Sequence, residues 1–390
     1  MGKTLLAGFK SFQTGLWGAY DPNAPTIIVI PGGPGGISIR EWSQNDEDTK
    51  TAFARYGFPA GYSYLFTDPR SVGCNLGDAI AFPDDGLSTE TLAQDIIAVI
   101  RLRKLTNYYL YGHSYGSQVA TVLASLIERQ NLTPPKAVIL SGVLGRFFHG
   151  ESETTIAQLE TQWNRLKPLL PARAVSIMQG IDPLGIPSDT WANFLLWGFY
   201  KQSVLVKGEM EFPLRDQLTL LGSSEPRDAE RLKAIVLAPS PGPQKAPEEK
   251  AAEARMNSII ACREIADVDY DLHFEGGEFL FGDKTDCSPF TFDRPYDAKN
   301  WPITQPIFYL SGELDPAAPP YQAQYHVAAE PRTDRFLIFV SDAGHSKIGD
   351  LMPDCREGLW MSFATKGAGL SEALSACTVK SRLSLFPKSP

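Results

Sequence analysis

Residues 108–117, YYLYGHSYGS, decide the fold of this chain. The aromatic run predicts a strand, Gly-x-Ser-x-Gly predicts a sharp turn, and the apolar residues that follow at 118–124, QVATVLA, predict a helix. A turn this tight brings neighbouring backbone very close, so it needs residues without a Cβ, which Gly112 and Gly116 provide. Ser114 then stands at the tip of the turn, in front of a helix N-terminus that favours negative charge.

Other strands are predicted at short, mainly apolar runs, of which the β-branched run at 26–30 is continuous, as in a strand buried on both faces of a parallel sheet. They lie at residues 26–30, 62–67, 136–143, 306–310 and 335–340. A helix that Ser88 or Thr89 can cap is predicted to run to about Leu102. Because strands and helices alternate over residues 26–143, we predict an α/β fold with a mostly parallel central sheet flanked by helices.

The pattern changes between residues 146 and 300, where the strand signals disappear. Apolar residues are helically spaced over 156–169 and 191–199, and a further helix is expected after a Pro-rich loop. We therefore expect a helical cap inserted at 146–300, with the core of the fold formed by 1–145 and 301–390.

The two ends of the chain carry weaker signals. Residues 4–20 resemble a β-hairpin, and residues 41–56 are expected to form a short helix or a loop. The polar tail is expected to pack as a helix near residues 370–376.

The charge of the chain argues against some partners. Its formal net charge of -9 disfavours nucleic acid and an anionic membrane surface. The longest apolar runs have the length of strands, and the first residues, MGKTLL, lack the pattern of a signal peptide. We therefore expect no nucleic-acid or membrane partner, while the oligomeric state is not predicted.

The cysteines leave two possibilities open. They are Cys74, Cys262, Cys287, Cys355 and Cys377. No pair has C-x-x-C spacing, so neither a zinc site nor a thioredoxin-type site is predicted. The cysteines could be reduced core residues of a cytosolic protein, or they could form two bridges plus one free thiol.

Three polar residues follow predicted strands, at the edge where an open α/β sheet places its active groups. These are Ser114, Asp315 and His345. A serine hydroxyl needs a base to take its proton and a carboxylate to orient that base. The order Ser, Asp, His is that of one known triad arrangement. We predict that these residues form a catalytic triad, which requires no metal and no cofactor.

Five histidines compete for the role of the base. His113 adjoins the serine and is expected to point away from it, while His149, His273 and His326 lie in the predicted insertion or in a helix. Only His345 lies in a loop after the last strand, so it is the preferred base.

Three carboxylates compete for the role of the acid. Asp315 is preferred because Pro316 fixes the turn that aims it, and Glu313 is its neighbour. Asp342 is a further candidate, but it is very close to His345 in the sequence.

The glycine-rich stretch at residues 31–36, PGGPGG, follows the first buried strand. A flexible loop and a phosphate cradle are alternatives, but the P-loop lysine and the Rossmann spacing are missing. We prefer an oxyanion hole, in which glycines let backbone N–H groups approach a reacting oxygen. The expected donors are the backbone amides of Gly33 and Tyr115.

Five motifs resemble the proline iminopeptidase and tripeptidyl aminopeptidase branch of the α/β-hydrolases. They lie at residues 31–36, 68–73, 112–116, 312–315 and 343–345. The resemblance implies an α/β-hydrolase fold and a serine exopeptidase that removes residues or short peptides from the free N-terminus of a small peptide.

The resemblance also extends to the cysteines. It implies Cys262–Cys287 and Cys355–Cys377 bridges, and hence an exported enzyme, secreted or periplasmic, whose leader is absent from this chain. A cytoplasmic location is the alternative.

The chain departs from this family at two places. Pro31 stands where iminopeptidases usually have His, and Trp197-Gly198-Phe199 stands where they tend to have Trp-Glu. Since that Glu would hold the free amine of the substrate, another carboxylate is expected to bind it.

The candidates for the substrate-binding carboxylate are Glu264, in the Cys-x-Glu element, and Glu275, with Glu278 weaker. For each of them singly, a solvated acidic side chain is the more common situation.

Two other functions fit the same residues. The first is an esterase or amidase that uses the same triad on a small ester or amide. The second is a binding module on an inactive hydrolase scaffold.

Overall fold

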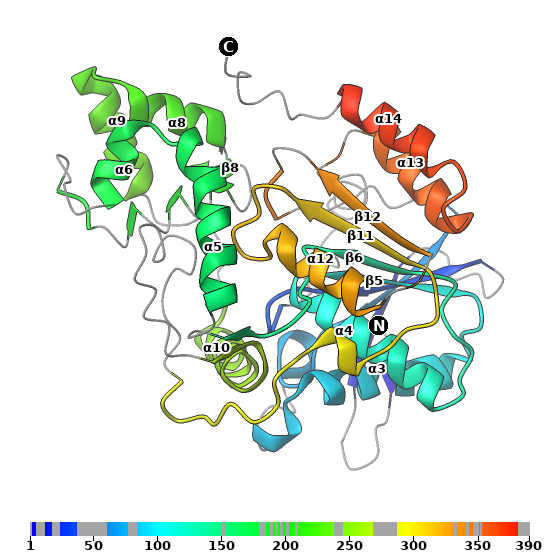
Figure 1. The fold of residues 1–390 in the computed structure, drawn as a ribbon. Helices are drawn as coiled ribbons and strands as arrows, with labels where there is room; N and C mark the ends of the chain where they lie inside the picture. The colour runs from blue at the N-terminus through cyan, green and yellow to red at the C-terminus, as the bar shows by residue number, and fades with distance from the viewer. Residues whose placement is uncertain are drawn as a thin grey trace.

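A computed structural model (Figure 1) describes residues 2–4, 12–17, 24–36, 61–76, 84–149, 153–178, 185–187, 190–191, 194–195, 198–199, 203–206, 210–237, 245–267, 287–330, 332, 334–340, 343–345, 351 and 353–380. The helix or loop expected at residues 41–56 lies outside them. The expected N-terminal hairpin is present as the antiparallel strands β1 (Gly2–Thr4) and β2 (Phe12–Trp17).

A mostly parallel sheet of eight strands forms the centre of the described structure. Its strands follow the order β1, β2, β4 (Ser63–Thr67), β3 (Thr26–Ile30), β5 (Tyr108–His113), β6 (Val138–Ser141), β11 (Ile307–Gly312) and β12 (Arg335–Val340). The pairs β1–β2 and β2–β4 are antiparallel, and all neighbours from β4 to β12 are parallel. The predicted fold class is therefore confirmed, and the parallel strands end at one common edge.

Helices cover both faces of this sheet (Figure 1). One face carries α3 (Thr89–Arg103), α4 (Tyr115–Arg129) and α12 (Pro320–Ala329), and the other carries α13 (Pro353–Ala364) and α14 (Leu370–Lys380). Alternate residues of each strand serve the two cores: Ile28 and Ile30 pack with α3 and α4, while Ile27 and Val29 pack with α13. Burial on both faces explains the continuous apolar runs that predicted the strands.

Helix α3 begins at one of the two predicted caps. The Ser88 hydroxyl accepts a hydrogen bond from the backbone N–H of Thr91 at 3.1 Å, so Ser88 is the N-cap. Thr89 is also buried, but its hydroxyl has other partners. A short 3-10 turn, η2 (Asp84–Gly86), precedes the helix.

Residues 146–300, here called the inserted segment, contain several helices. They are α5 (Glu153–Leu166), the 3-10 turn η3 (Lys167–Leu169), α6 (Ala172–Met178), α8 (Leu214–Gly222), α9 (Pro226–Val236), α10 (Pro247–Ile260) and the 3-10 turn η5 (Ala298–Asn300). Part of the segment forms a separate hydrophobic cluster, which includes Trp163, Trp191 and Phe199 and is joined by Leu314 from the loop after β11. Helices α5, α6, α8 and α9, in green, lie beyond the edge at which β11 and β12 end (Figure 1).

The expectation that the inserted segment lacks strands is wrong. Strands β8 (Ser203–Val206) and β9 (Met210–Pro213) pair antiparallel, and β7 (Phe148–His149) and β10 (Ala266–Asp267) pair in parallel. These strands have only two to four residues, so no period-2 pattern is long enough to be recognised in the sequence.

Helix α10 begins where the sequence predicts it. Pro247 occupies the first turn, and the Glu249 carboxylate accepts a hydrogen bond from the backbone N–H of Ala246 at 3.1 Å. The helix continues directly into a π-helical turn, η4 (Ala261–Ile265). Such turns are rare in proteins overall, but those that occur are frequently found at functional sites.

The Cys262–Cys287 bridge implied by the resemblance is present, with its Cα atoms 5.3 Å apart. Cys355 is also disulfide-bonded, while the side chain of Cys377 lies outside the described residues. Within the ranges that the structure describes, no helix is long and apolar enough to cross a membrane, and no cluster of metal-binding side chains occurs.

A buried ion pair between α3 and the loop after β4 provides a test of this packing. Arg70 Nε donates to Asp95 Oδ2 at 2.7 Å, Arg70 Nη2 donates to Oδ1, and both side chains are almost fully buried. Replacing Asp95 with Asn should lower the free energy of unfolding in urea by about 3–5 kcal/mol, because it leaves the guanidinium without its counter-charge. The exposed control Glu90→Gln should change it by less than about 0.5 kcal/mol. An Asp95→Asn variant as stable as the wild type contradicts the described pairing.

Candidate active site

Ser114 lies in the turn between β5 and α4, with φ 56° and ψ −129°. A positive φ is uncommon for a residue with a Cβ and costs of order 1–3 kcal/mol, so the surroundings must hold it. They do so by close approach. A Cβ on Gly116 would lie 2.3 Å from the carbonyl oxygen of Ile30, and a Cβ on Gly112 would lie 2.3 Å from that of Gly116. Only glycine fits at these two positions.

The glycine-rich loop at residues 31–36 lies against Ser114. A Cβ on Gly32 would lie 2.9 Å from Ser114 Cβ and 3.5 Å from Ser114 Oγ. Gly33 is exposed and has φ 121°, and the Gly36 N–H donates to the Gly32 carbonyl oxygen at 3.1 Å. The two residues expected to supply oxyanion donors, Gly33 and Tyr115, thus lie in segments that flank Ser114.

His345 and Asp315 are in direct contact. His345 Nδ1 donates to Asp315 Oδ2 at 2.6 Å, and both side chains are buried. The other carboxylate oxygen, Asp315 Oδ1, accepts from the backbone N–H groups of Ala317 and Ala318, each at 2.9 Å. Since a carboxylate only accepts, the ring proton sits on Nδ1, and Nε2 is the nitrogen that can take a proton.

Contacts along β5 and β6 place this pair beside Ser114. The Ser114 N–H donates to the Ser141 carbonyl oxygen at 2.8 Å. The next residue, Gly142, faces the imidazole so closely that a Cβ there would lie 2.6 Å from His345 Cε1. The rings of His113 and His345 are 4.7 Å apart. The three predicted triad residues therefore lie together at the carboxyl edge of the sheet.

The inserted segment reaches the loop that carries Asp315. Gln162 on α5 is buried, and its Nε2 donates to the carbonyl oxygens of Glu313 and Asp315, each at 3.1 Å. Between these two acids, the hydrogen bond to His345 is made by Asp315. The third candidate, Asp342, lies outside the described residues.

The other histidines have different surroundings. The Thr121 hydroxyl donates to the Ser117 carbonyl oxygen at 2.8 Å, so it accepts from His326 Nε2 at 3.0 Å, and the Tyr309 hydroxyl donates to His326 Nδ1 at 3.0 Å. Burial lowers the pKa of His326 to about 4, so this ring is neutral and structural.

The side chains of the remaining two histidines lie outside the described part of the structure. His149 pairs with Asp267 in the short strands β7 and β10, and His273 lies outside the described residues.

Glu264 lies in the interior, with 5% of its surface exposed. Its carboxylate accepts from the Thr89 N–H at 3.0 Å, from Gln118 Nε2 at 3.2 Å and from the Thr89 hydroxyl. Burial raises the pKa of Glu264 to about 7, while the bonds from Thr89 and the charges of Arg294 and Arg263 act in the opposite direction. The surroundings of this carboxylate are protein groups rather than an open surface.

The other residues expected near the substrate are only partly described. Glu275, Glu278 and Trp197 lie outside the described residues. Phe199 is fully buried in the core of the inserted segment, and Pro31 directly follows β3.

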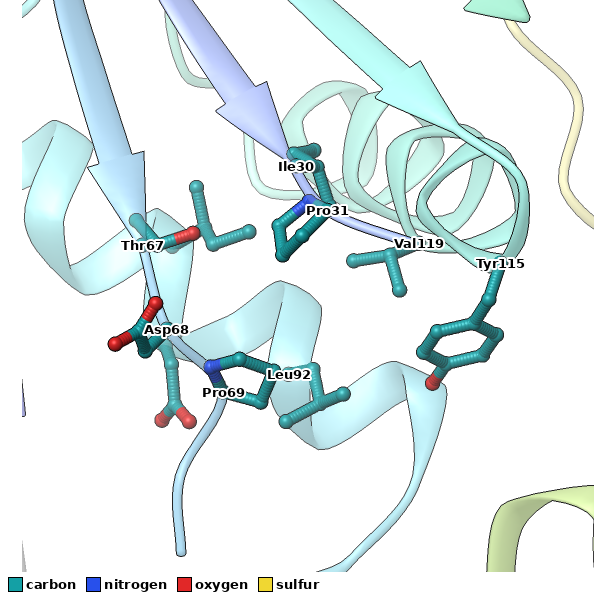
Figure 2. Close-up of a pocket in the computed structure, with 10 residues that line it drawn as sticks. Ile30, Pro31, Thr67, Asp68, Pro69, Leu92, Tyr115 and Val119 are labelled. Atoms are coloured by element: carbon teal, nitrogen blue, oxygen red, sulfur yellow. The ribbon is translucent and has the colours of Figure 1, made fainter. Parts of the chain in front are cut away.

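A small cavity lies next to the end of β3 (Figure 2). Ile30 and Pro31 line one side of it, Asp68 and Pro69 another, and Tyr115 projects from the start of α4 (Figure 2). The centre of a water molecule can reach about 20 Å³ of it. That is room for about one water molecule, so this cavity does not hold a peptide.

Comparisons with known proteins place this geometry in a wider group. A model of the thioesterase domain matches residues 78–228, which is less than half of the chain. The matched residues include Ser114 but neither Asp315 nor His345. No curated protein matches the chain significantly. The solved proline iminopeptidase of Mycobacterium smegmatis is 14% identical, with a TM-score of 0.50 over 96% of this chain and 99% of that one.

Two further solved structures cover similar shares. An esterase from a Rhodococcus species is 14% identical, with a TM-score of 0.46 over 94% of this chain and 98% of that one. A proline iminopeptidase-related protein from Thermus thermophilus is 16% identical, with a TM-score of 0.44 over 96% and 100%.

The chain has the α/β-hydrolase fold. Identities this low show the fold alone, and they do not separate a peptidase from an esterase. The fold and the matched thioesterase-domain model together support a hydrolase of the α/β-hydrolase type.

Three residues of the site were missed by the sequence analysis: Gly142, Gln162 and Thr89. A glycine directly after a buried strand is a signal that could have revealed Gly142. Nothing in the sequence pattern marks the other two, because Gln162 bonds to a residue 153 positions away and Thr89 to one 175 positions away.

A methyl group at Gly142 should disable the site. In Gly142→Ala the Cβ overlaps the His345 ring and displaces it, so the rate of labelling by a fluorophosphonate should fall by about 100-fold or more. Gly369→Ala is the matched control, since Gly369 also has a positive φ but its Cβ would meet nothing within 4 Å. Equal labelling of the two variants contradicts the placement of His345.

His326 should make the protein less stable in acid. Its pKa is about 4 in the folded state against an ordinary 6.5, so the unfolded chain binds more protons between these values. The contribution of the neutral His326 ring to the free energy of unfolding is fully present above pH 6.5. It is lost as the pH falls towards 4, and the loss is on the order of 3 kcal/mol. Urea unfolding at pH 7 and pH 4.5 should therefore show a smaller loss in His326→Gln than in the wild type. Equal losses contradict the neutral, buried ring.

Proposed function

We propose that the protein is a serine exopeptidase that cleaves residues or short peptides from the free N-terminus of small peptides, with Ser114, His345 and Asp315 as its triad. The hydrogen bond between His345 and Asp315, beside the turn that carries Ser114, is the observation that carries this proposal. The peptide substrate is supported by the five motifs that resemble those of proline iminopeptidases.

The first half of the proposed reaction forms an acyl-enzyme. Ser114 Oγ attacks the scissile carbonyl carbon while His345 Nε2 takes the hydroxyl proton, and Asp315 stabilises the imidazolium. The backbone N–H groups of Gly33 and Tyr115 bind the oxyanion, where each such donor is worth about 10²–10³ in rate. The N-terminus of α4 adds its dipole.

The second half releases the products. The carbon–nitrogen bond breaks as the imidazolium of His345 gives its proton to the leaving amine. Water, deprotonated by His345, then hydrolyses the ester on Ser114, and the serine regains its proton. None of these steps requires a metal or a cofactor, so EDTA should leave the activity unchanged.

An oxidising compartment, secreted or periplasmic, is the proposed location. The Cys262–Cys287 bridge supports it, because disulfides persist mainly outside the cytosol. The net charge of -9 makes nucleic acid and anionic membranes poor partners, and a small peptide is the proposed ligand.

An ester or thioester hydrolase is the second candidate. The thioesterase-domain match over residues 78–228 favours it, since that model covers the nucleophile turn. The same triad would act, with oxygen or sulfur in place of nitrogen as the leaving atom.

Replacement of Ser114 with Ala tests the shared chemistry. Both hydrolysis and fluorophosphonate labelling should fall by at least about 10³-fold, because no hydroxyl remains to attack. Ser224→Ala, an exposed serine in the inserted segment, is the control and should behave as the wild type. A wild-type protein that neither labels nor hydrolyses would instead indicate an inactive binding scaffold.

A substrate panel separates the two candidates. Arylamides of one, two and three residues with a free N-terminus should give a higher kcat/KM than their N-blocked counterparts and than simple acyl esters and thioesters. Faster turnover of blocked or simple acyl substrates would favour the second candidate, since the two differ only in the pocket beside the triad.

A further inference from the structure

The turn η4 and the helix before it contact both halves of the proposed oxyanion hole. On one side, the glycine-rich loop rests on α10: a Cβ on Gly35 would lie 3.2 Å from the Glu253 carbonyl oxygen and 3.6 Å from Met256 Cβ. On the other side, Glu264 in η4 is hydrogen-bonded to Thr89 and Gln118. One continuous piece of backbone therefore supports the loop of Gly33 and the start of α4.

A chain of hydrogen bonds connects Glu264 to Tyr115. The Tyr115 hydroxyl lies 2.9 Å from Thr89 Oγ1, and the Thr89 hydroxyl is hydrogen-bonded to Glu264 Oε2. Gln118 Nε2 donates to Thr89 Oγ1 at 2.9 Å and to Glu264 Oε2 at 3.2 Å. Because an ionised carboxylate only accepts, Thr89 donates to Glu264 and accepts from Tyr115.

This chain is closed to solvent. Tyr115, Thr89, Gln118 and Glu264 are each 5% exposed or less. Three donors, namely the two groups of Thr89 and the amide of Gln118, converge on the carboxylate of Glu264. A buried carboxylate with three donors orients each of them, and loss of the acceptor leaves those donors unsatisfied.

The turn η4 is itself anchored. Cys262 is bonded to Cys287, and the segment after that cysteine pairs with the turn, with Arg294 N–H donating to the Arg263 carbonyl oxygen at 3.0 Å. Tyr296 N–H likewise donates to the Glu264 carbonyl oxygen at 2.8 Å. The turn that carries Glu264 is therefore held both by the Cys262–Cys287 bridge and by backbone hydrogen bonds from the segment after Cys287.

We propose that Glu264 is a positioning residue for the oxyanion hole: through Thr89 it fixes the side chain of Tyr115, whose backbone N–H is a donor to the oxyanion. This role replaces the contact with the substrate amine that the sequence suggests for Glu264. It rests on the proposed function, because it matters only if Ser114 is acylated. Tyr115 is the first residue of α4, so a shift of its side chain moves the amide next to Ser114.

Two isosteric variants test the proposal at pH 8, where Glu264 is mostly ionised. Glu264→Gln places an amide donor against groups that already donate, and Thr89→Val removes the central hydroxyl. Each should lower kcat and the rate of fluorophosphonate labelling by about tenfold, less than the loss of a whole oxyanion donor, with KM changed by less than about twofold. Thr89→Ser keeps the hydroxyl and should restore most of the wild-type rate.

The choice of substrate separates this role from amine binding. If Glu264 is a positioning residue, its replacement should lower the rate by the same factor with unblocked arylamides, with N-blocked esters and with the fluorophosphonate, which has no amine. An amine-binding residue should raise KM for unblocked peptides alone, and that result overturns the proposal. Exposed Glu248 on α10 provides the control Glu248→Gln, which should match the wild type.

Failure of the two proposals would look different. If the wild type is not labelled at all, the proposed function fails. If the wild type is labelled, and both Glu264→Gln and Thr89→Val are labelled as fast as the wild type, only the positioning role fails. Urea unfolding of each variant checks that the proteins being compared are folded. If Glu264→Gln does not fold, the comparison of Thr89→Ser with Thr89→Val tests the positioning role.

Discussion

The close approach of three backbone segments at the start of α4 is the constraint on which the rest of the site depends. The end of β3, the end of β5 and the first turn of α4 leave no room for a Cβ at Gly112 or Gly116. Held in this way, Ser114 keeps a positive φ that it would not adopt alone. The same contacts bring the glycine-rich loop against its side chain, so backbone packing sets the position of Ser114 relative to that loop.

The inserted segment is part of this arrangement. Gln162 on α5 donates a hydrogen bond to the loop of Asp315. Glu264 in η4 is connected to Tyr115 by two hydrogen bonds that share the Thr89 hydroxyl. Two ends of one segment therefore contact the loop of Asp315 and the residues around the start of α4. A change in this segment can consequently move side chains on both sides of Ser114.

The sequence predicts the parts of this structure that depend on local pattern. Continuous apolar runs located the buried strands such as β3, and the glycines around Ser114 located the nucleophile turn, because each requirement is met within a few residues. Strands as short as β8 have too few residues for a pattern. The environment of Glu264 could not be predicted at all, since its partner Thr89 is 175 positions away. The sequence left Glu264 as either a ligand of the substrate amine or a solvated side chain, whereas the fold buries it.

The central claim is that Ser114 is the nucleophile whose Oγ carries the acyl group of a covalent intermediate. The most direct measurement is peptide mapping by mass spectrometry after the enzyme is mixed with a slowly deacylated substrate and quenched in acid. The account predicts one acyl group, carried by the peptide that contains Ser114. An acyl group on any other residue, or turnover of that substrate with no acylated peptide at all, would contradict it.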